Sequence, residues 1–291
     1  MASDSVTVVG LGLMGSALAR AAVAAGLGVT VWNRSAAKAQ AFADGPARIA
    51  TTIEEAVDAS DVVVVCVRDH DATNEALRTS TVEKRLAGKV IVQLSTGTPT
   101  QAREAAAWAV GVGAEYLDGS IMGFPQDIGT DGLVILYGGE QASFDRCRLV
   151  AAAFGGTAMR IGSSPGSAAA LDNALLSIYF SFLFGVLSGA AICDAEGIPL
   201  DAFKEVGSSL MPTFGGVLDR SVDMIASDSY ASEHSTLHTS WGAMSQIAAV
   251  VRDAELDDRF VECMRTYAAE AIDAGHGTLG NAVLFKHLRR R

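Results

Sequence analysis

Six residues near the N-terminus have the spacing of a turn that binds a dinucleotide. They read G-L-G-L-M-G, between an apolar run and an alanine-rich stretch, and are Gly10, Leu11, Gly12, Leu13, Met14 and Gly15. The first glycine permits a tight turn, the second admits a pyrophosphate, and the third lets helix and strand pack closely. The following helix N-terminus favours phosphates. Between a strand and a helix, the pattern predicts a dinucleotide site; the alternative is that the glycines serve packing alone.

The end of the second expected strand indicates which dinucleotide binds. NAD-binding folds place an acidic residue there, on the ribose 2′-OH, whereas this chain reads Trp-Asn-Arg-Ser with a lysine one turn later. An arginine can stack on adenine and meet a 2′-phosphate, and a serine and a lysine can add a hydrogen bond and positive charge. The sequence therefore predicts NADPH/NADP+ as the cofactor, bound by Asn33, Arg34, Ser35 and Lys38. The alternative is that Arg34 and Lys38 are solvated surface charges.

Two later strand ends complete the predicted cofactor site. Cys66 and Val67 end the apolar run 62–67, and Ser95 and Thr96 follow the next strand. Ligands of open α/β sheets bind outside the carboxyl ends of the strands. We therefore expect Cys66 and Val67 beside the nicotinamide-side ribose, and Ser95 and Thr96 near the nicotinamide or the substrate.

Strand and helix patterns alternate from residue 6 to residue 161, which predicts βαβ units and a doubly wound parallel sheet. After residue 168 the apolar residues recur only at helical spacing. The expected fold is an α/β N-terminal Rossmann domain, residues 1–163, followed by an all-α C-terminal substrate and dimerisation domain, residues 164–291, that begins with a long interdomain helix. The expected strands are 6–9, 29–32, 62–67, 89–94, 115–118, 133–137 and 157–161, and the expected helices are 14–25, 35–43, 53–59, 99–110 and 144–154.

The composition excludes several classes of protein. The 291 residues carry a net charge of −11 and are 49% hydrophobic, which indicates a large core and no nucleic-acid or anionic-membrane partner. The basic triplet Arg289–Arg291 is expected to be a solvated tail. Four separated cysteines and five scattered histidines have no metal-ligand spacing, so no metal is expected. Reduced thiols and an acidic N-terminus without a signal-peptide pattern favour the cytoplasm.

Residues 174–193 carry no charge and are long enough to span a membrane. Three serines interrupt the run, and no Lys or Arg lies within ten residues of either end, so the usual membrane anchors are missing. We expect instead a helix that is buried in a soluble protein. Because a helix that is apolar all round must be covered on every side, we expect a second subunit to contribute to its burial.

Several stretches resemble the 6-phosphogluconate and β-hydroxyacid dehydrogenase superfamily over essentially the whole chain, and imine reductases within it. They are the G-L-G-x-M-G turn, the W-N-R-S-x-x-K strand end, V-Q-L-S-T-G-T-P at 92–99, Y-L-D-G-S-I-M at 116–122 and A-L-L-S at 174–177. The resemblance implies a homodimer with interlocked C-terminal helices. It places each active site between one Rossmann domain and the helices of the partner subunit.

One position departs from the β-hydroxyacid dehydrogenases. Those enzymes carry G-x-G-x-x-x-K-x-x-N-N at the start of the long helix, whereas this chain has Asp172 at the lysine and Leu175 and Leu176 at the asparagines. A carboxylate suits an iminium cation better than a developing alkoxide. A carboxyl that is protonated because burial raises its pKa could instead donate to a neutral imine. The alternative is that Asp172 serves as a negative charge near the N-terminus of the long helix, where it stabilises the helix. Asp172 could serve both this structural role and the catalytic one.

The resemblance implies further site residues. Met122 and Phe124 lie in a loop expected over the substrate. Tyr179 and Phe180 follow Asp172 by two helical turns, and Phe180 stands where many imine reductases have a tyrosine, so Tyr179 is the candidate hydroxyl. His238 and Trp241 are expected to enter the pocket from the partner subunit. Core packing is the alternative for Tyr179 and Phe180, and a structural role is the alternative for His238.

The predicted function is NADPH-dependent reduction of small, cyclic imines or iminium ions to amines, with Asp172 as proton donor or iminium-stabilising carboxylate. Three alternatives stay open: an NADP-dependent β-hydroxyacid dehydrogenase with a different base, a reductive aminase that also promotes imine formation, and a non-catalytic NADPH-binding protein.

Overall fold

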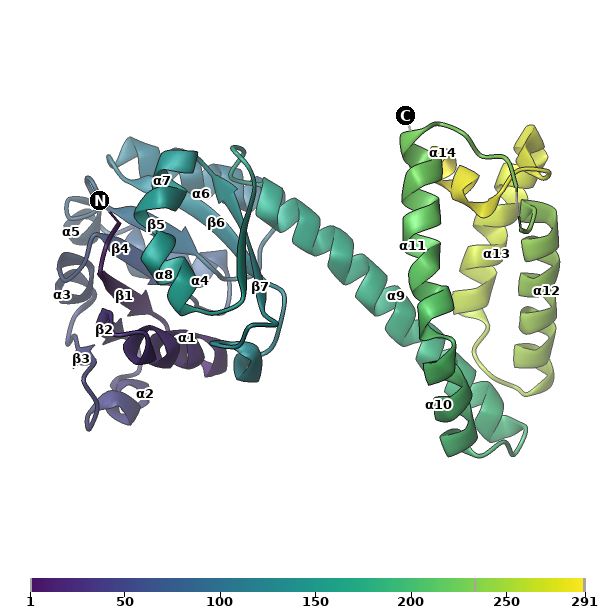
Figure 1. Cartoon of the computed structure of the whole chain (residues 1–291), viewed down its shortest axis with the longest axis horizontal. Coiled ribbons are helices and arrows are strands. Elements are labelled where there is room, and N and C mark those ends of the chain that lie inside the picture. The colour runs from purple at the N-terminus through teal and green to yellow at the C-terminus, as the bar shows by residue number, and fades with distance from the viewer. Residues whose placement is uncertain (1, 233, 290–291) are drawn as a thin grey trace. The chain divides into compact units, whose positions relative to one another are not determined.

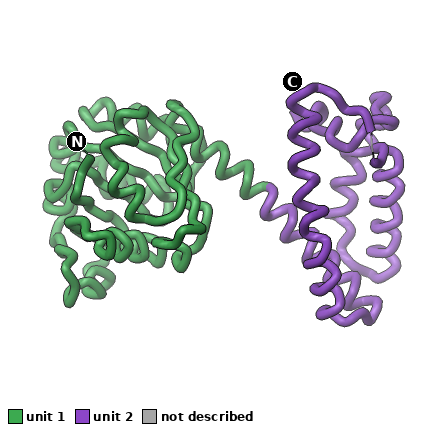
Figure 2. The backbone as a smooth tube through the Cα atoms, viewed as in Figure 1, with its two compact units in different colours: residues 1–177 green, residues 178–291 purple. Residues whose placement is uncertain are grey.

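The computed structural model describes residues 2–232 and 234–289, in two compact units (Figure 2). The first unit comprises residues 1–177 and the second residues 178–291. Arg290 and Arg291 of the expected basic tail lie outside the described residues.

A single eight-stranded sheet forms the centre of the first unit, with strand order β3-β2-β1-β4-β5-β6-β7-β8 (Figure 1). The strands are β1 (Ser5–Val9), β2 (Gly28–Trp32), β3 (Arg48–Ile49), β4 (Val62–Val65), β5 (Val90–Gln93), β6 (Glu115–Ile121), β7 (Val134–Gly139) and β8 (Thr157–Gly162). The helices are α1 (Leu13–Ala24), α2 (Ala36–Ala39), α3 (Ile53–Asp58), α4 (His70–Leu77), α5 (Ser80–Glu83), α6 (Pro99–Gly111), α7 (Gln141–Arg146) and α8 (Arg148–Ala153).

Strand β4 shows why the chain folds into a sheet with two covered faces. All four of its valines are fully buried. Because side chains alternate between the faces of a strand, Val62 and Val64 pack in one core cluster and Val63 and Val65 in the other. A continuous apolar run is typical of a parallel strand buried on both faces. The predicted Rossmann-type sheet is confirmed.

The sheet differs from the prediction at its second edge. Strands β6 and β7 pair antiparallel, with Gly119 opposite Tyr137, so the sheet is not parallel throughout. The connection between them is an irregular loop with one short 3-10 turn at Pro125–Asp127, and not a crossover helix. Antiparallel neighbours can be joined by such a short connection, whereas parallel neighbours need a longer crossover. The helix expected over 144–154 is also interrupted, since α7 and α8 meet at Cys147.

The second unit is helical, as predicted. Its core cluster includes Leu237, Ala268, Ala271 and Val283. Its helices are α10 (Leu200–Ser209), α11 (Met211–Ala226), α12 (Leu237–Asp253), α13 (Arg259–Ala271) and α14 (Leu284–Leu288), and the long helix α9 (Ser167–Ala195) begins in the first unit and continues into the second.

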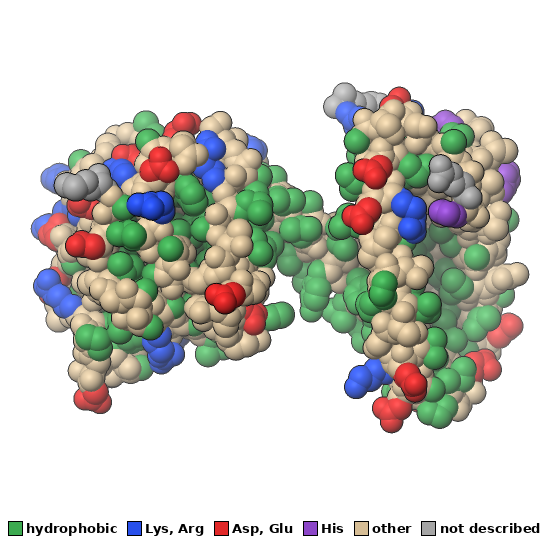
Figure 3. All heavy atoms as spheres, viewed as in Figure 1, with side chains coloured by type: hydrophobic (Ala, Val, Ile, Leu, Met, Phe, Trp, Pro, Cys, Tyr) green, Lys and Arg blue, Asp and Glu red, His purple; other side chains and the backbone are tan. Residues whose placement is uncertain are grey.

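One chain alone does not bury α9, and the expected contribution of a second subunit stays a prediction. Only Ala168, Ala169 and Asp172 of this helix are buried, while Ile178 and Leu187 are more than half exposed. Hydrophobic side chains gather along its length (Figure 3). By length and composition alone, α9 is also apolar enough to cross a membrane. Its apolar surface therefore has no sufficient cover within one chain.

Candidate active site

The glycine turn joins β1 to α1, and a side chain would be blocked at two of its three glycines. Gly10 has a φ of +98°, and a Cβ there would lie 2.3 Å from the Cys66 carbonyl oxygen. A Cβ on Gly15 would lie 2.0 Å from the Gly10 carbonyl oxygen. A Cβ on Gly12 would meet nothing within 4 Å. The first and third glycines are therefore needed for close packing, while the second leaves open space in front of the helix.

That open space belongs to a cleft of about 650 Å³ at the carboxyl ends of β1, β2 and β4. Such a volume is in the range of cofactor sites. The N–H groups of Leu13, Met14 and Gly15 precede the first intrahelical bond, from Ser16 N to Gly12 O, and are oriented for an anion at the N-terminus of α1. The cleft is lined by Gly10, Gly12, Leu13, Met14, Gly15, Trp32, Asn33, Arg34, Ser35, Lys38, Ile53, Glu54, Cys66, Val67, Arg68, Ala72, Glu75, Ala76, Thr79 and Thr81.

The Asn33 side chain hydrogen-bonds the glycine turn to the end of β2. Its Oδ1 accepts a hydrogen bond from Leu11 N at 2.9 Å, and its Nδ2 donates to the Ser35 carbonyl at 3.0 Å. Leu11 itself is buried and does not line the cleft. The structure thus gives Asn33 a positioning contact that sequence reasoning did not predict.

Arg34 and Lys38 give the outer part of the cleft its positive charge. Both are exposed, and Arg34 Nη1 lies 2.9 Å from Glu75 Oε2 on α4. Exposed ion pairs contribute little to stability, so Arg34 is available to an incoming phosphate. Ser35 stands at the N-cap position of α2 but makes no capping hydrogen bond with its side chain. The residues present therefore fit a dinucleotide with a 2′-phosphate.

Four further residues were predicted to bind the cofactor. Cys66 and Val67 line the cleft, and burial raises the pKa of the Cys66 thiol to about 11, which keeps it neutral. Ser95 is buried, and its hydroxyl accepts a hydrogen bond from Val67 N at 3.0 Å. Ser95 therefore does not line the cleft itself but positions Val67, which does. Thr96 is exposed and lies outside the cleft lining.

Asp172 is a buried carboxyl in the second turn of α9, with 7% of the residue exposed. Burial raises the pKa of its carboxyl above the usual value, and the Ser120 hydroxyl on β6 opposes that rise. A second buried carboxyl, Asp118, lies two residues before Ser120 and accepts a hydrogen bond from Ala169 N at 3.0 Å. Burial raises the pKa of Asp118 to about 7, partly offset by the Ala169 N–H and reinforced by the charge of Asp172.

Asn173 ties the same part of α9 to the loop after β5. Its Nδ2 donates to the Gly97 carbonyl at 3.0 Å and to the Ala169 carbonyl at 2.8 Å. Gly97 follows Ser95 and Thr96 directly. The Asp172 carboxyl is therefore held on a helix that is attached to the loop between β5 and α6.

The remaining predicted residues are not brought together with Asp172 by any contact of the described chain. Met122 is half-buried, and Phe124 is 61% exposed. Tyr179 and Phe180 are exposed on the second-unit part of α9, where their rings pack edge to face at 5.3 Å. His238 is exposed at the start of α12, against Gly277. Trp241 packs on the helical core beneath Arg265.

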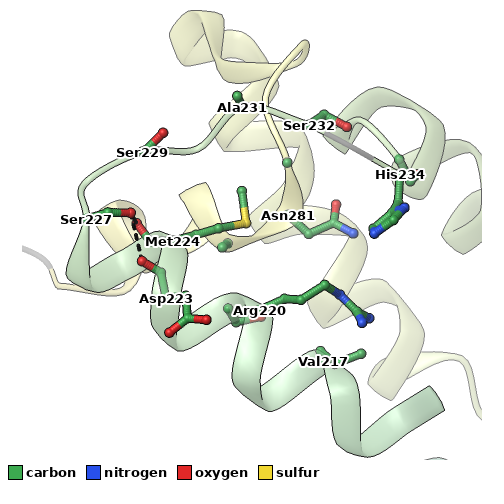
Figure 4. Close-up of a pocket in the computed structure, with 14 residues that line it drawn as sticks. Val217, Arg220, Asp223, Met224, Ser227, Ser229, Ala231, Ser232, His234 and Asn281 are labelled. Carbon is green, nitrogen blue, oxygen red and sulfur yellow. Dashed lines mark hydrogen bonds between the residues drawn. The ribbon is translucent and has the colours of Figure 1, made fainter.

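Another cleft, of about 500 Å³, lies in the helical unit at the end of α11 (Figure 4). It contains Arg220 and His234 but also Asp223, and none of the residues predicted for the site. Among the residues that the structure describes, no group of three or more His, Cys, Asp or Glu side chains could hold a metal ion. The chemistry of the described chain therefore centres on the β1–α1 cleft and on Asp172.

Sequence reasoning missed the residues that reach the site from distant segments. Glu75, Thr79 and Thr81 form the far wall of the cleft, and Asp118 and Ser120 contact the first turns of α9. The D-x-S spacing on a strand was the available signal, because alternate strand residues face the same way. The sequence does not predict that Asp118 and Ser120 face the first turns of α9.

This fold and site define a Rossmann-type dinucleotide-binding protein. Residues 5–162 match the family described as the NAD binding domain of 6-phosphogluconate dehydrogenase, and residues 164–290 match the NADPH-dependent reductive aminase-like C-terminal domain. An imine reductase from Myxococcus stipitatus in complex with NADP+ is 36% identical, with a TM-score of 0.93 over 98% of this chain and 99% of that chain. The chain therefore belongs to the imine reductase and reductive aminase family.

Two fungal relatives agree with this assignment. The NADPH-dependent reductive aminase of Aspergillus oryzae is 29% identical over 99% of this chain and 98% of its own length. A reductive aminase from Aspergillus terreus, solved with NADPH4, cyclohexanone and allyl amine, is 30% identical, with a TM-score of 0.89 over 98% of this chain and 99% of that chain.

The glycine turn yields a first prediction. Gly12→Ala adds a methyl group where the protein has open space, so the fold is retained, but the methyl would stand where a pyrophosphate must approach the turn. We expect the dissociation constant for NADPH to rise by at least about tenfold, equivalent to about 1.4 kcal/mol, with only a small fall in the melting temperature, because alanine is a poorer N-cap than glycine. Fluorescence titration and thermal unfolding measure the two effects.

Two variants control this experiment. Gly111→Ala, also in open space but at the end of α6, should leave the NADPH affinity unchanged and should not lower the melting temperature, because alanine favours a helix more than glycine does. Gly10→Ala should lower the melting temperature, since its Cβ would meet the Cys66 backbone. Unchanged NADPH affinity in Gly12→Ala would contradict the assignment of the cleft.

Proposed function

We propose that this chain reduces imines or iminium ions to amines with NADPH as the hydride donor. The observation that carries the proposal is the buried carboxyl of Asp172 in the second turn of α9, in a chain whose relatives are imine reductases and reductive aminases. When bound, NADPH supplies the hydride that the carbon of the C=N bond accepts. The protein supplies position and charge.

The chain's own residues divide this work between them. The N–H groups at the start of α1 hold the pyrophosphate, and Arg34, Ser35 and Lys38 hold the 2′-phosphate. Asn33 holds the glycine turn against the end of β2 by its hydrogen bond from Leu11 N, and the Ser95 hydroxyl holds Val67 by accepting a hydrogen bond from Val67 N. These residues bind and orient the cofactor, and none of them moves a proton.

Asp172 acts on the nitrogen of the substrate. Reduction of a neutral imine consumes one hydride and one proton, and an iminium ion already carries that proton. Burial favours the neutral carboxyl, which can donate the proton, while the Ser120 hydroxyl favours the carboxylate, which stabilises the cation. Either state suits a reaction in which positive charge on nitrogen is lost. The ionised carboxylate does not suit an alkoxide that gains negative charge, which argues against a hydroxyacid substrate for that state of Asp172.

The second prediction tests this role with 2-methyl-1-pyrroline. The wild-type protein should oxidise NADPH with this imine and should not reduce NADP+ with short β-hydroxy acids. Asp172→Asn keeps the size of the side chain but removes its proton and charge, so kcat/KM should fall by about 10²- to 10⁴-fold. NADPH affinity should not change, because Asp172 lies outside the cofactor cleft.

Asp131→Asn is the matched control, since Asp131 is an exposed carboxyl of the same unit. It should leave kcat/KM unchanged. The role of Asp172 is refuted by an Asp172→Asn variant that retains imine turnover. Oxidation of a hydroxy acid without imine turnover would refute the proposed function itself.

Reductive amination is a second candidate, favoured by the relative solved with a ketone and an amine. In that reaction the enzyme also promotes condensation of the two substrates. The third prediction is therefore NADPH oxidation with cyclohexanone and allyl amine at near-equimolar concentrations. An enzyme that only reduces imines would instead need a large excess of amine, which shifts the condensation equilibrium in solution.

We further propose a homodimer that covers α9. This proposal is supported by the exposed apolar side chains of that helix, among them Ile178, Phe184 and Leu187. Association removes apolar surface from water and is the usual way to cover so large a patch. The fourth prediction is a light-scattering mass of about twice the 30.1 kDa of one chain. A monomer in detergent-free buffer would contradict the proposal.

A further inference from the structure

Two acidic side chains line the cofactor cleft, although the cofactor is an anion. They are Glu54 on α3 and Glu75 on α4, and they share the cleft wall with Arg34, Lys38 and Arg68. The pyrophosphate and the 2′-phosphate of NADPH are negatively charged, so a carboxylate in this cleft opposes binding when it faces either of them. The contacts of each carboxylate therefore decide its effect on the cofactor.

Glu54 and Arg68 have partners other than Arg34. The Glu54 carboxylate accepts a hydrogen bond from the Thr81 hydroxyl on α5 at 2.7 Å. Arg68 Nε lies 2.7 Å from Oδ2 of Asp69, a residue that does not line the cleft. Among the residues that the structure describes, Glu75 is the acidic side chain that pairs with Arg34.

The pair of Glu75 with Arg34 joins α4 to the end of β2. Glu75 Oε2 lies 2.9 Å from Arg34 Nη1, and the two residues are 41 positions apart in the chain. The Arg34 side chain is 79% exposed and the Glu75 side chain 62% exposed. An ion pair that is so open to solvent contributes little to folding. Its main effect is therefore on a ligand that binds to Arg34.

A phosphate at Arg34 meets the Glu75 carboxylate in two ways. While Nη1 donates to Glu75, it does not donate to a phosphate oxygen, so the two anions compete for one guanidinium. A phosphate that binds the other nitrogens of Arg34 still has Glu75 on the same guanidinium and is repelled by it. Both effects oppose the 2′-phosphate of NADPH. Neither acts on the uncharged 2′-hydroxyl of NADH.

We propose that Glu75 is a specificity-determining residue that limits the preference of this chain for NADPH over NADH. Its carboxylate offsets part of the positive charge that Arg34 and Lys38 present to the 2′-phosphate. The preference is therefore smaller than these two cations alone would give. The proposal rests on the assignment of Arg34 to the 2′-phosphate under the proposed function, and does not depend on the reaction at Asp172.

The test measures the dissociation constants of NADPH and NADH by fluorescence titration of the full chain at low ionic strength. Glu75→Gln keeps the size of the side chain and removes its charge. The constant for NADPH should fall and that for NADH should stay nearly the same. The ratio of the NADH constant to the NADPH constant should therefore rise by about threefold to tenfold, as expected for one charge near a phosphate in a solvated site.

Glu104→Gln is the matched control, because Glu104 is an exposed glutamate of α6 outside the cleft lining. It should leave the ratio unchanged. Glu75→Asp shortens the side chain but retains the charge, so it should also keep a ratio close to that of wild type. An aspartate variant with the same ratio as Glu75→Gln would overturn the inference.

Salt separates an effect of charge from an effect of shape. At 1 M ionic strength the Debye length is about 3 Å, so exposed charges across the cleft are screened from one another. The difference in ratio between Glu75→Gln and wild type should therefore disappear as NaCl is raised to about 1 M. A difference that persists at this salt concentration would mean that shape causes it, and would overturn the inference.

Arg34→Gln tests the assignment on which the inference rests. It should lower the ratio by about tenfold, because the guanidinium that binds the 2′-phosphate is lost. If Arg34→Gln leaves the ratio unchanged, the assignment fails and the inference fails with it. If Arg34→Gln lowers the ratio but Glu75→Gln leaves it unchanged, only the inference is overturned. A lower ratio in Glu75→Gln also overturns it, since Glu75 would then hold Arg34 onto the phosphate. None of these titrations requires an imine, so they decide the matter even if the protein reduces none.

Discussion

The proposed chemistry depends on one buried carboxyl, Asp172, at the start of an apolar helix. Burying an ionised carboxylate without partners is unfavourable, so the fold must supply hydrogen bonds or leave a proton on the group. It does both, because burial raises the pKa while the Ser120 hydroxyl offers a hydrogen bond. Alanines at 168 and 169 let the helix approach β6 closely enough for these contacts. A lysine at this position would reverse the charge and the chemistry.

The cofactor cleft and the buried carboxyl share one framework. The sheet order places β1 between β2 and β4. The glycine turn therefore lies at the point where the strand order reverses, which is the usual ligand position in such folds. The loop after β5 then connects the two regions. Its Ser95 hydroxyl holds Val67 on the cleft wall, and its Gly97 carbonyl holds Asn173 on α9. A displacement of this loop would affect cofactor and carboxyl together.

The sequence predicts those structural elements whose formation depends on residues close together in the chain. The glycine turn between β1 and α1, the buried run of β4 and the start of α6 at Pro99 follow from spacing, hydropathy and capping within a few residues. Contacts between distant segments could not be predicted in this way. The pairing of Arg34 with Glu75, of Asn33 with Leu11 and of Asp118 with Ala169 spans 22 to 51 residues and requires the fold. The exposure of α9 within one chain likewise depends on what lies beside it, which its composition does not reveal.

The most direct test of this account is the titration of the Asp172 carboxyl itself. Carboxyl-¹³C NMR of aspartate-labelled protein, with the resonance assigned by its loss in Asp172→Asn, reports the protonation of this group without cofactor or substrate. The account predicts a midpoint above about 3.9, the value of an unperturbed aspartate. A midpoint at or below that value would mean that folding does not hold a proton on Asp172, and would contradict the central claim.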